Sequence, residues 1–183
     1  GNANPGLAVV LVGEDPASAT YVRGKERASV EVGMHSETRR LPTEVTQEEL
    51  LGVIAELNAD PAITGFLVQL PLPDHIDDDT VLHAIAPGKD VDGIHPFNMG
   101  LLLGGTPRLA PATPTGVLRL LAEEGVDTSG KHVVICGRSN IVGRPLAGLL
   151  LKRGNGGDAT VTVCHSRTVD LGSFTRQADI LVA

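Results

Sequence analysis

Residues 132–145 read HVVICGRSNIVGRP and establish the fold class of the C-terminal half. The run His132–Cys136 is typical of a short buried strand, and an apolar helix is expected to begin near Leu146. Between them, Gly137 and Gly143 allow a ligand to approach the backbone closely. Because N–H groups at a helix N-terminus bind phosphate, the stretch predicts a dinucleotide-binding turn. The alternative is a glycine-rich turn without a ligand, since the spacing departs from G-x-G-x-x-G.

The segment after the next expected strand, Ala159–Cys164, indicates which dinucleotide is bound. NAD enzymes usually carry an acidic residue near this point. This chain has Ser166, Arg167 and Thr168 instead, and hydroxyls with a cation favour the 2′-phosphate of NADP. Arg138 in the preceding loop adds a forked cation. The alternative is a solvated polar loop.

Composition excludes several classes of protein. The chain has 183 residues, of which 42% are hydrophobic, enough for one large or two small domains. A net charge of -7 and 2% aromatic residues argue against nucleic-acid partners. No apolar run approaches the roughly 20 residues that span a bilayer, and no signal peptide is recognised, so a cytoplasmic protein without a membrane partner is expected. Cys136 and Cys164 are expected to be reduced and structural.

The order of expected elements predicts an α/β protein with two parallel-sheet domains. A proline- and glycine-rich passage from Pro87 to Pro114 is interpreted as the connection, followed by a helix over Thr115–Glu124. We therefore predict a catalytic domain over residues 1–112 and a Rossmann-type domain over 113–183, both truncated at the chain ends. The first domain is expected to contain strands over 7–12, 35–41 and 63–70, helices over 18–32 and 46–58, and a short helix after Asp77.

One lysine in the first domain is a candidate for chemistry. With Ser18 as the expected N-cap, Tyr21, Lys25, Ala28 and Val32 share one helical face, which is otherwise apolar and is predicted to point inward. Desolvation there would lower the lysine pKa toward neutrality, as a proton shuttle requires. The alternative is a lysine that buries only its aliphatic stem.

Two polar residues at strand ends or turns complete the candidate site. Gln69 ends the strand before the prolines, where its amide can bond an ammonium or a ligand, or simply face water. Asp92 lies in KDVDG, a turn sequence, and its carboxylate can accept two parallel N–H bonds from an aminopyrimidine edge. No metal is expected, because the acidic run over residues 74–79 lacks calcium-loop spacing and the histidines lack zinc spacing.

Several motifs in order resemble the bifunctional methylenetetrahydrofolate dehydrogenase/cyclohydrolase family. They are DPAS with YVRGK at 15–18 and 21–25, VQLPLP at 68–73, KDVDGIHPFN at 89–98, GRSNIVGRP at 137–145 and CHSRT at 164–168. The resemblance covers essentially the whole chain. It implies oxidation of 5,10-methylene-tetrahydrofolate by NADP+ and hydrolysis of the methenyl product to 10-formyl-tetrahydrofolate, in one-carbon metabolism that feeds purine and amino-acid biosynthesis.

The resemblance also implies residue roles and a homodimer, with substrate and cofactor meeting between the domains. Lys25 would be the catalytic lysine, Gln69 would tune it, Tyr21 would stack on the folate beside Leu70 and Pro71, and Asp92 would hold the pterin. The residues implied in cofactor binding are Gly137, Arg138, Ser139, Ile141, Val142, Gly143, Pro145, His165, Ser166 and Arg167.

The chain departs from the family pattern at two places, and some members of the family keep only one activity or prefer NAD. Ala112 stands where the family often has cysteine, and residues 154–158 form an insertion-like loop. The alternatives are a monofunctional NAD(P)-dependent methylenetetrahydrofolate dehydrogenase and a non-catalytic NADP-binding module. A 2-hydroxy acid dehydrogenase would need a His and Arg pair for a carboxylate, which the sequence does not reveal.

Overall fold

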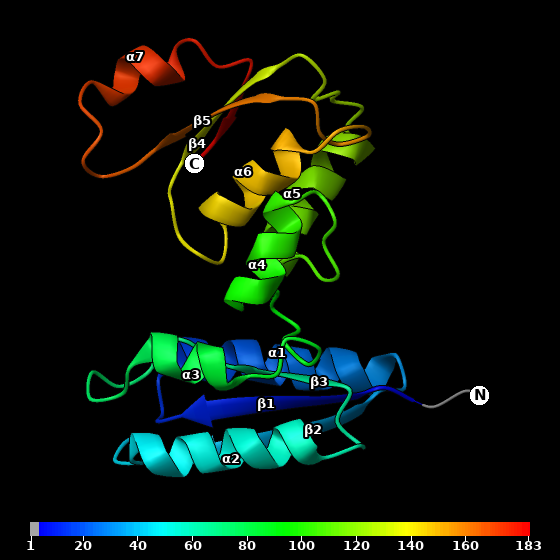
Figure 1. Cartoon of the computed structure of the whole chain (residues 1–183), viewed down its shortest axis with the longest axis vertical. Coiled ribbons are helices and arrows are strands. Elements are labelled where there is room, and N and C mark those ends of the chain that lie inside the picture. Colours follow the sequence, from blue (N-terminus) through cyan, green and yellow to red (C-terminus); the bar gives the residue numbers. More distant parts are fainter. Residues whose placement is uncertain (1–3) are drawn as a thin grey trace. The chain divides into compact units, whose positions relative to one another are not determined.

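A computed structural model describes residues 4–183, which divide into two compact units between Val91 and Asp92. Each unit is a three-stranded parallel sheet with helices packed against it (Figure 1). The predicted α/β class with two parallel-sheet domains is therefore confirmed. None of the helices within residues 4–183 is both long enough and apolar enough to cross a bilayer.

The N-terminal unit has strand order β2-β1-β3, with β1 in the centre. Its strands are β1 (Gly6–Val12), β2 (His35–Leu41) and β3 (Gly65–Val68), and its helices are α1 (Pro16–Glu31), α2 (Gln47–Ala59) and α3 (Asp78–Ala84). Side chains of β1 alternate between the two faces of the sheet. Val10 packs in the core that contains Ile54 of α2, whereas Val9 packs with Val22 of α1. Helices α1 and α2 thus cover opposite faces (Figure 1).

The C-terminal unit has strand order β5-β4-β6, again with its first strand in the centre. Its strands are β4 (His132–Cys136), β5 (Thr160–Cys164) and β6 (Ile180–Val182), and its helices are α4 (Pro96–Leu103), α5 (Ala112–Glu123), α6 (Gly143–Leu151) and α7 (Leu171–Thr175). Val133 and Ile135 form a buried core with Leu146 and Leu150 of α6. This is a separate core from those of the N-terminal unit.

The N-cap that was predicted for the first helix is wrong. Asp15, not Ser18, is the N-cap of α1: its carboxylate accepts a hydrogen bond of 2.7 Å from the Ser18 backbone N–H. That hydrogen bond stabilises the charged form and holds the pKa of Asp15 below its ordinary value. Pro16 occupies the first helical turn, where its missing N–H costs no hydrogen bond.

The interpretation of residues 87–114 as a mere connection is also wrong. The passage contains α4, capped by His95, with Pro96 in the first turn. Leu102 of α4 is buried against α6, where Gly148 makes room: a Cβ on Gly148 would lie 2.3 Å from Leu102 Cδ2. The predicted domain boundary at residue 112 remains a prediction, while the compact units divide earlier, at Val91.

Candidate functional sites

The N-terminal candidate site lies where β3 ends. Ligands of open parallel sheets bind outside the carboxyl ends of strands that flank a change in strand order. The order β2-β1-β3 places this point at β1 and β3. Gln69 directly follows β3, and its backbone N–H donates to the Val10 carbonyl of β1 at 2.8 Å. The sheet therefore fixes the backbone of Gln69 beside the end of β1.

Lys25 and Gln69, which are 44 residues apart in sequence, are hydrogen-bonded. The Lys25 Nζ donates to Gln69 Oε1 at 3.3 Å. The Gln69 side-chain Nε2 donates to the Leu70 carbonyl at 2.9 Å, just before the cis Leu70–Pro71 bond. Because the amide nitrogen is occupied by Leu70, the carbonyl oxygen faces the lysine. The structure thus brings together two of the predicted site residues and holds Nζ at a defined point.

The predicted inward orientation of the helical face with Tyr21 and Lys25 is wrong. The residues of α1 that are buried are Ser18, Val22 and Ser29, because this stripe faces the sheet. Tyr21 is 69% exposed and Val32 is 72% exposed, and Lys25 is half-buried at the border between the two stripes. An exposed aromatic ring one helical turn before the lysine leaves a flat apolar surface open to a ligand.

Asp92 belongs to the second compact unit and is half-buried. The predicted roles of Asp92, Leu70 and Pro71 in substrate binding remain predictions. Asp90 is 2% exposed, and its backbone pairs in a bridge with Phe66 of β3. The backbone N–H of Asp90 donates to the Ala86 carbonyl at 3.1 Å.

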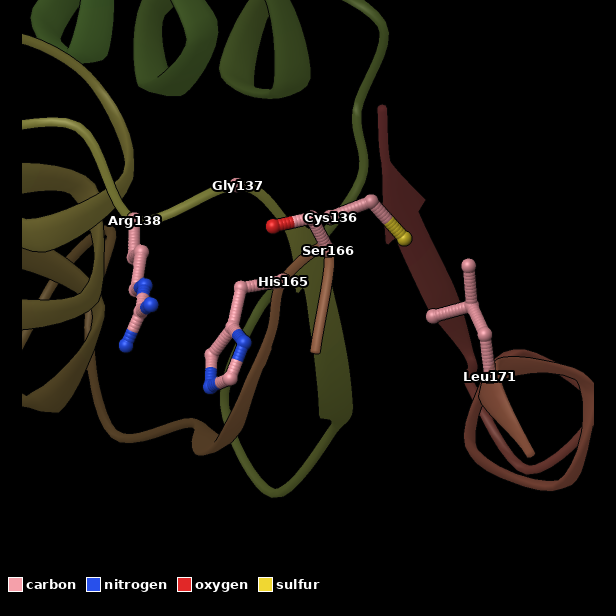
Figure 2. A pocket seen from close by; sticks show the side chains of 6 residues that line it. All are labelled: Cys136, Gly137, Arg138, His165, Ser166 and Leu171. Atoms are coloured by element: carbon pink, nitrogen blue, oxygen red, sulfur yellow. The ribbon is translucent and has the colours of Figure 1, made fainter. Parts of the chain in front are cut away.

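The C-terminal candidate site is a pocket at the carboxyl ends of β4 and β5. Its volume is about 390 Å³, within the range of small-molecule sites. The lining residues are Cys136, Gly137, Arg138, His165, Ser166 and Leu171 (Figure 2). Four of the predicted cofactor residues therefore line one cavity. Cys136 and Leu171 were not predicted; the position of Cys136 at the strand end could have indicated it, whereas Leu171 depends on how α7 folds back.

Two glycines shape the pocket's backbone. Gly137 has a φ of +155°, a conformation that residues with a side chain rarely adopt. A Cβ on Gly143 would lie 2.1 Å from the Gly137 carbonyl oxygen, so only glycine permits this close approach of α6 to the loop. The tight turn that the sequence predicts is thus present, and it suits close approach of a phosphate.

The other predicted cofactor residues do not line the pocket. The Ser139 hydroxyl accepts hydrogen bonds from the N–H groups of Val142 (3.2 Å) and Gly143 (3.4 Å), so it caps the start of α6. Pro145 is buried in α6. The Arg167 backbone N–H donates to His165 Nδ1 at 3.2 Å, which leaves Nε2 as the proton-bearing nitrogen of a neutral His165 ring. The cofactor roles of Ser139, Ile141, Val142, Gly143, Pro145 and Arg167 stay predictions.

The acidic run over residues 74–79 ends in the first turn of α3, and Asp77 is the N-cap of that helix. The Asp77 carboxylate accepts from the Thr80 N–H at 2.7 Å, and these hydrogen bonds lower the pKa of Asp77. In the part of the chain that the structure describes, no three His, Cys, Asp or Glu side chains are grouped to hold a metal ion.

Comparison with known families identifies both units. Residues 1–92 match the catalytic domain of tetrahydrofolate dehydrogenase/cyclohydrolase, and residues 111–183 match its NAD(P)-binding domain. The chain belongs to the tetrahydrofolate dehydrogenase/cyclohydrolase family. Residues 111–183 of the second unit are accordingly an NAD(P)-binding domain of this family, whereas the catalytic-domain match extends to Asp92, one residue past the division between the compact units.

Individual relatives of this tetrahydrofolate dehydrogenase/cyclohydrolase chain are highly similar over nearly its whole length. The bifunctional protein FolD of Salinibacter ruber is 56% identical over 98% of the chain, and that of Phenylobacterium zucineum is 59% identical over 98%. The chain covers 60% and 59% of these two proteins, so it spans about three-fifths of their length.

Solved structures agree with this assignment. The bifunctional FolD enzyme of Campylobacter jejuni is 51% identical, with a TM-score of 0.92 over 98% of this chain and 63% of that one. The Trypanosoma brucei enzyme, solved with NADP cofactor and an inhibitor, is 41% identical, with a TM-score of 0.90 over 97% of this chain and 60% of that one.

Proposed function

We propose that this chain carries the folate site and the NADP site of a bifunctional enzyme. The enzyme oxidises 5,10-methylene-tetrahydrofolate to the 5,10-methenyl cation with NADP+ and hydrolyses that cation to 10-formyl-tetrahydrofolate. The observation that carries the proposal is the hydrogen bond between Lys25 Nζ and Gln69 Oε1 at the end of β3. Relatives that are 56% and 59% identical to this chain over 179 aligned residues are named bifunctional.

The pair of Lys25 and Gln69 serves the hydrolytic step. Addition of water to the methenyl carbon releases a proton, and opening of the ring requires a proton on the departing nitrogen. Lys25 Nζ exchanges these protons, and Gln69 Oε1 keeps Nζ in place by accepting one N–H. The exposed Tyr21 ring stacks on the flat folate, and Asp92 accepts N–H bonds from the pterin edge.

The pocket of the second unit holds the dinucleotide. Gly137 and Gly143 allow the backbone to approach the pyrophosphate, while Arg138 and Ser166 bind the 2′-phosphate. None of the six lining residues is acidic, so nothing in the lining repels that phosphate. When bound, NADP+ supplies the hydride acceptor.

The decisive experiment is Lys25→Met, for which both cyclohydrolase turnover and NADP binding are measured. We expect conversion of methenyl- to formyl-tetrahydrofolate to fall by at least about 100-fold, because the proton-transfer group is lost. NADP binding, measured by isothermal titration calorimetry, should be unchanged because Lys25 lies in the other unit. The matched control is Arg27→Met on the same helix, since Arg27 is exposed and pairs only with Glu31 in the residues described.

Three outcomes would contradict the proposal. Unchanged cyclohydrolase turnover in Lys25→Met would refute the role of the lysine. A wild-type protein that oxidises methylene-tetrahydrofolate without forming the formyl product would be a monofunctional dehydrogenase, and one that binds NADP without turnover would be a cofactor-binding module.

The resemblance supports two further proposals about the protein as a whole: it acts in the cytoplasm and forms a homodimer. Light scattering during gel filtration gives the mass of the assembly and tests the homodimer. A monomer at micromolar concentration would contradict it.

A further inference from the structure

Cys136 and Cys164 are neighbours across two strands. They occupy paired positions in the parallel register of β4 and β5, at the carboxyl end of each strand. Adjacent strands lie about 4.8 Å apart, within the Cα separation of about 4.4–6.8 Å that a disulfide requires. The strand spacing is therefore compatible with a bond between the two sulfurs.

The two thiols also lie on the same face of the sheet. Side chains alternate along a strand, so Cys136 shares a face with His132, and Cys164 shares a face with Thr162. His132 Nε2 and Thr162 Oγ1 are 2.9 Å apart, which shows that these two faces coincide. The opposite face, with Val133 and Ile135, packs against α6.

The environments of the two thiols differ. Both are free, and Cys164 is 1% exposed. Cys136 is partly exposed and lines the pocket, where its sulfur points toward Leu171 (Figure 2). A dissolved reagent therefore reaches Cys136 first, through the pocket.

We propose that Cys136 and Cys164 form an oxidisable dithiol site for hydroperoxides in the wall of this pocket. The Cys136 sulfur attacks one peroxide oxygen, the O–O bond breaks, and the thiol proton leaves with the departing alcohol or water. The Cys164 sulfur then attacks the Cys136 sulfenic acid; an S–S bond forms, the S–O bond breaks, and water leaves with the Cys164 proton. Two thiols are oxidised to one disulfide, and one hydroperoxide is reduced.

Oxidation and dinucleotide binding compete at this site. Cys136 lines the same cavity as Gly137 and Arg138, so a dinucleotide in the cavity covers the reactive thiol. This step rests on the proposed NADP-binding function, whereas formation of the disulfide does not.

The test is to treat the chain with hydrogen peroxide and digest it with trypsin after the remaining thiols are blocked. Cleavage after Lys131 and Arg138, and after Arg153 and Arg167, places the two cysteines in separate peptides. We expect these peptides, 132–138 and 154–167, to be joined within one chain, lighter by two hydrogen atoms and separated again by a reductant. Cys136→Ser and Cys164→Ser should each abolish the joined product.

A register control separates strand geometry from nearness in sequence. The double variant with Val163→Cys and Cys164→Ala keeps two thiols but moves one of them to the opposite face of β5. Val163 is 37% exposed, so the new thiol is open to solvent. The joined peptides should be lost in this variant, and equal yields in the variant and the wild type would overturn the proposal.

Other results would also overturn it. They are oxidation of Cys136 to sulfinic acid with Cys164 still reduced, disulfides only between chains, and no reaction of either thiol in the folded chain. Because a fold defect in the serine variants would mimic a loss of the joined product, circular dichroism of each variant accompanies the mass measurement.

A second arm uses NADP as the probe. At ten times its dissociation constant, NADP should slow the oxidation about ten-fold, because only about one chain in eleven is then free. If NADP does not bind but the disulfide forms, the proposed cofactor function fails and the dithiol site stands. If NADP binds without slowing the reaction, competition at the pocket is refuted.

Discussion

Arg138 is the residue that we expect to distinguish NADP from NAD. It is the only guanidinium among the six residues that line the pocket. Replacement by alanine removes the guanidinium that we propose pairs with the 2′-phosphate, so Arg138→Ala should raise the dissociation constant of NADP about 10- to 100-fold. NAD lacks that phosphate and should be affected only slightly. Isothermal titration calorimetry with both dinucleotides measures the two constants.

Arg144 offers a matched control for Arg138. It lies in the same glycine-rich segment, but its guanidinium donates to Asn140 at 2.8 Å and does not line the pocket. Arg144→Ala should leave the ratio of NADP to NAD affinity unchanged. Equal losses for NADP and NAD in Arg138→Ala would show that the arginine does not contact the 2′-phosphate.

Single residues of the candidate sites were predictable where a strand end determines their position. Gln69 directly follows β3 and is hydrogen-bonded to Lys25, and Arg138 is the second residue after β4 and lines the pocket. Tyr21 and Lys25 were predicted on an inward face, which is wrong because helical periodicity alone does not say which stripe meets the sheet. The contact of Val22 with β1 decides that, and it depends on the tertiary fold.

Helix α6 depends on a close approach of its first residue to the preceding loop. A Cβ at Gly143 would lie 2.1 Å from the Gly137 carbonyl oxygen, so Gly143→Ala forces the loop away from the helix. We expect a loss of about 1–3 kcal/mol in the free energy of unfolding and a large loss of dinucleotide binding. Urea denaturation and a dinucleotide titration measure the two effects.

A second helical glycine provides the comparison. Gly116 in α5 has no atom near the position of a Cβ, so Gly116→Ala meets no obstacle. Alanine is the better helix former by up to about 1 kcal/mol, and the variant should be as stable as the wild type or more so. If the two alanine variants had the same stability, the close approach at Gly143 would not limit the fold.

Two strands were predicted with the bounds that the structure shows, whereas α4 was not predicted at all. The predicted strands over 35–41 and 132–136 coincide with β2 and β4. Proline and glycine around α4 suggested a loop, but Pro96 suits the first turn of a helix and Gly104 ends it. The stability of this short apolar helix comes from packing on α6, which no local pattern reveals.

At the scale of the whole molecule, each unit has its own core. The clusters around Leu50 and Val9 lie within residues up to Val91, and the cluster around Leu146 lies in the second unit. Separate cores predict that the two units fold independently. The location of the boundary then decides which fragments are stable.

A boundary at Val91 and a boundary at residue 112 assign α4 to different units. Because Leu102 is 1% exposed and packs on Gly148, a fragment over residues 92–183 should be more stable than one over 113–183. Loss of one buried leucine costs about 2–5 kcal/mol, and loss of the whole helix should cost at least that amount. Urea denaturation followed by circular dichroism compares the two fragments.

The two fragments over residues 1–91 and 1–112 serve as the control. The first unit should have the same free energy of unfolding in both, since α4 adds nothing to its core. Equal stability of the two C-terminal fragments, or a more stable 1–112 fragment, would instead assign α4 to the catalytic domain.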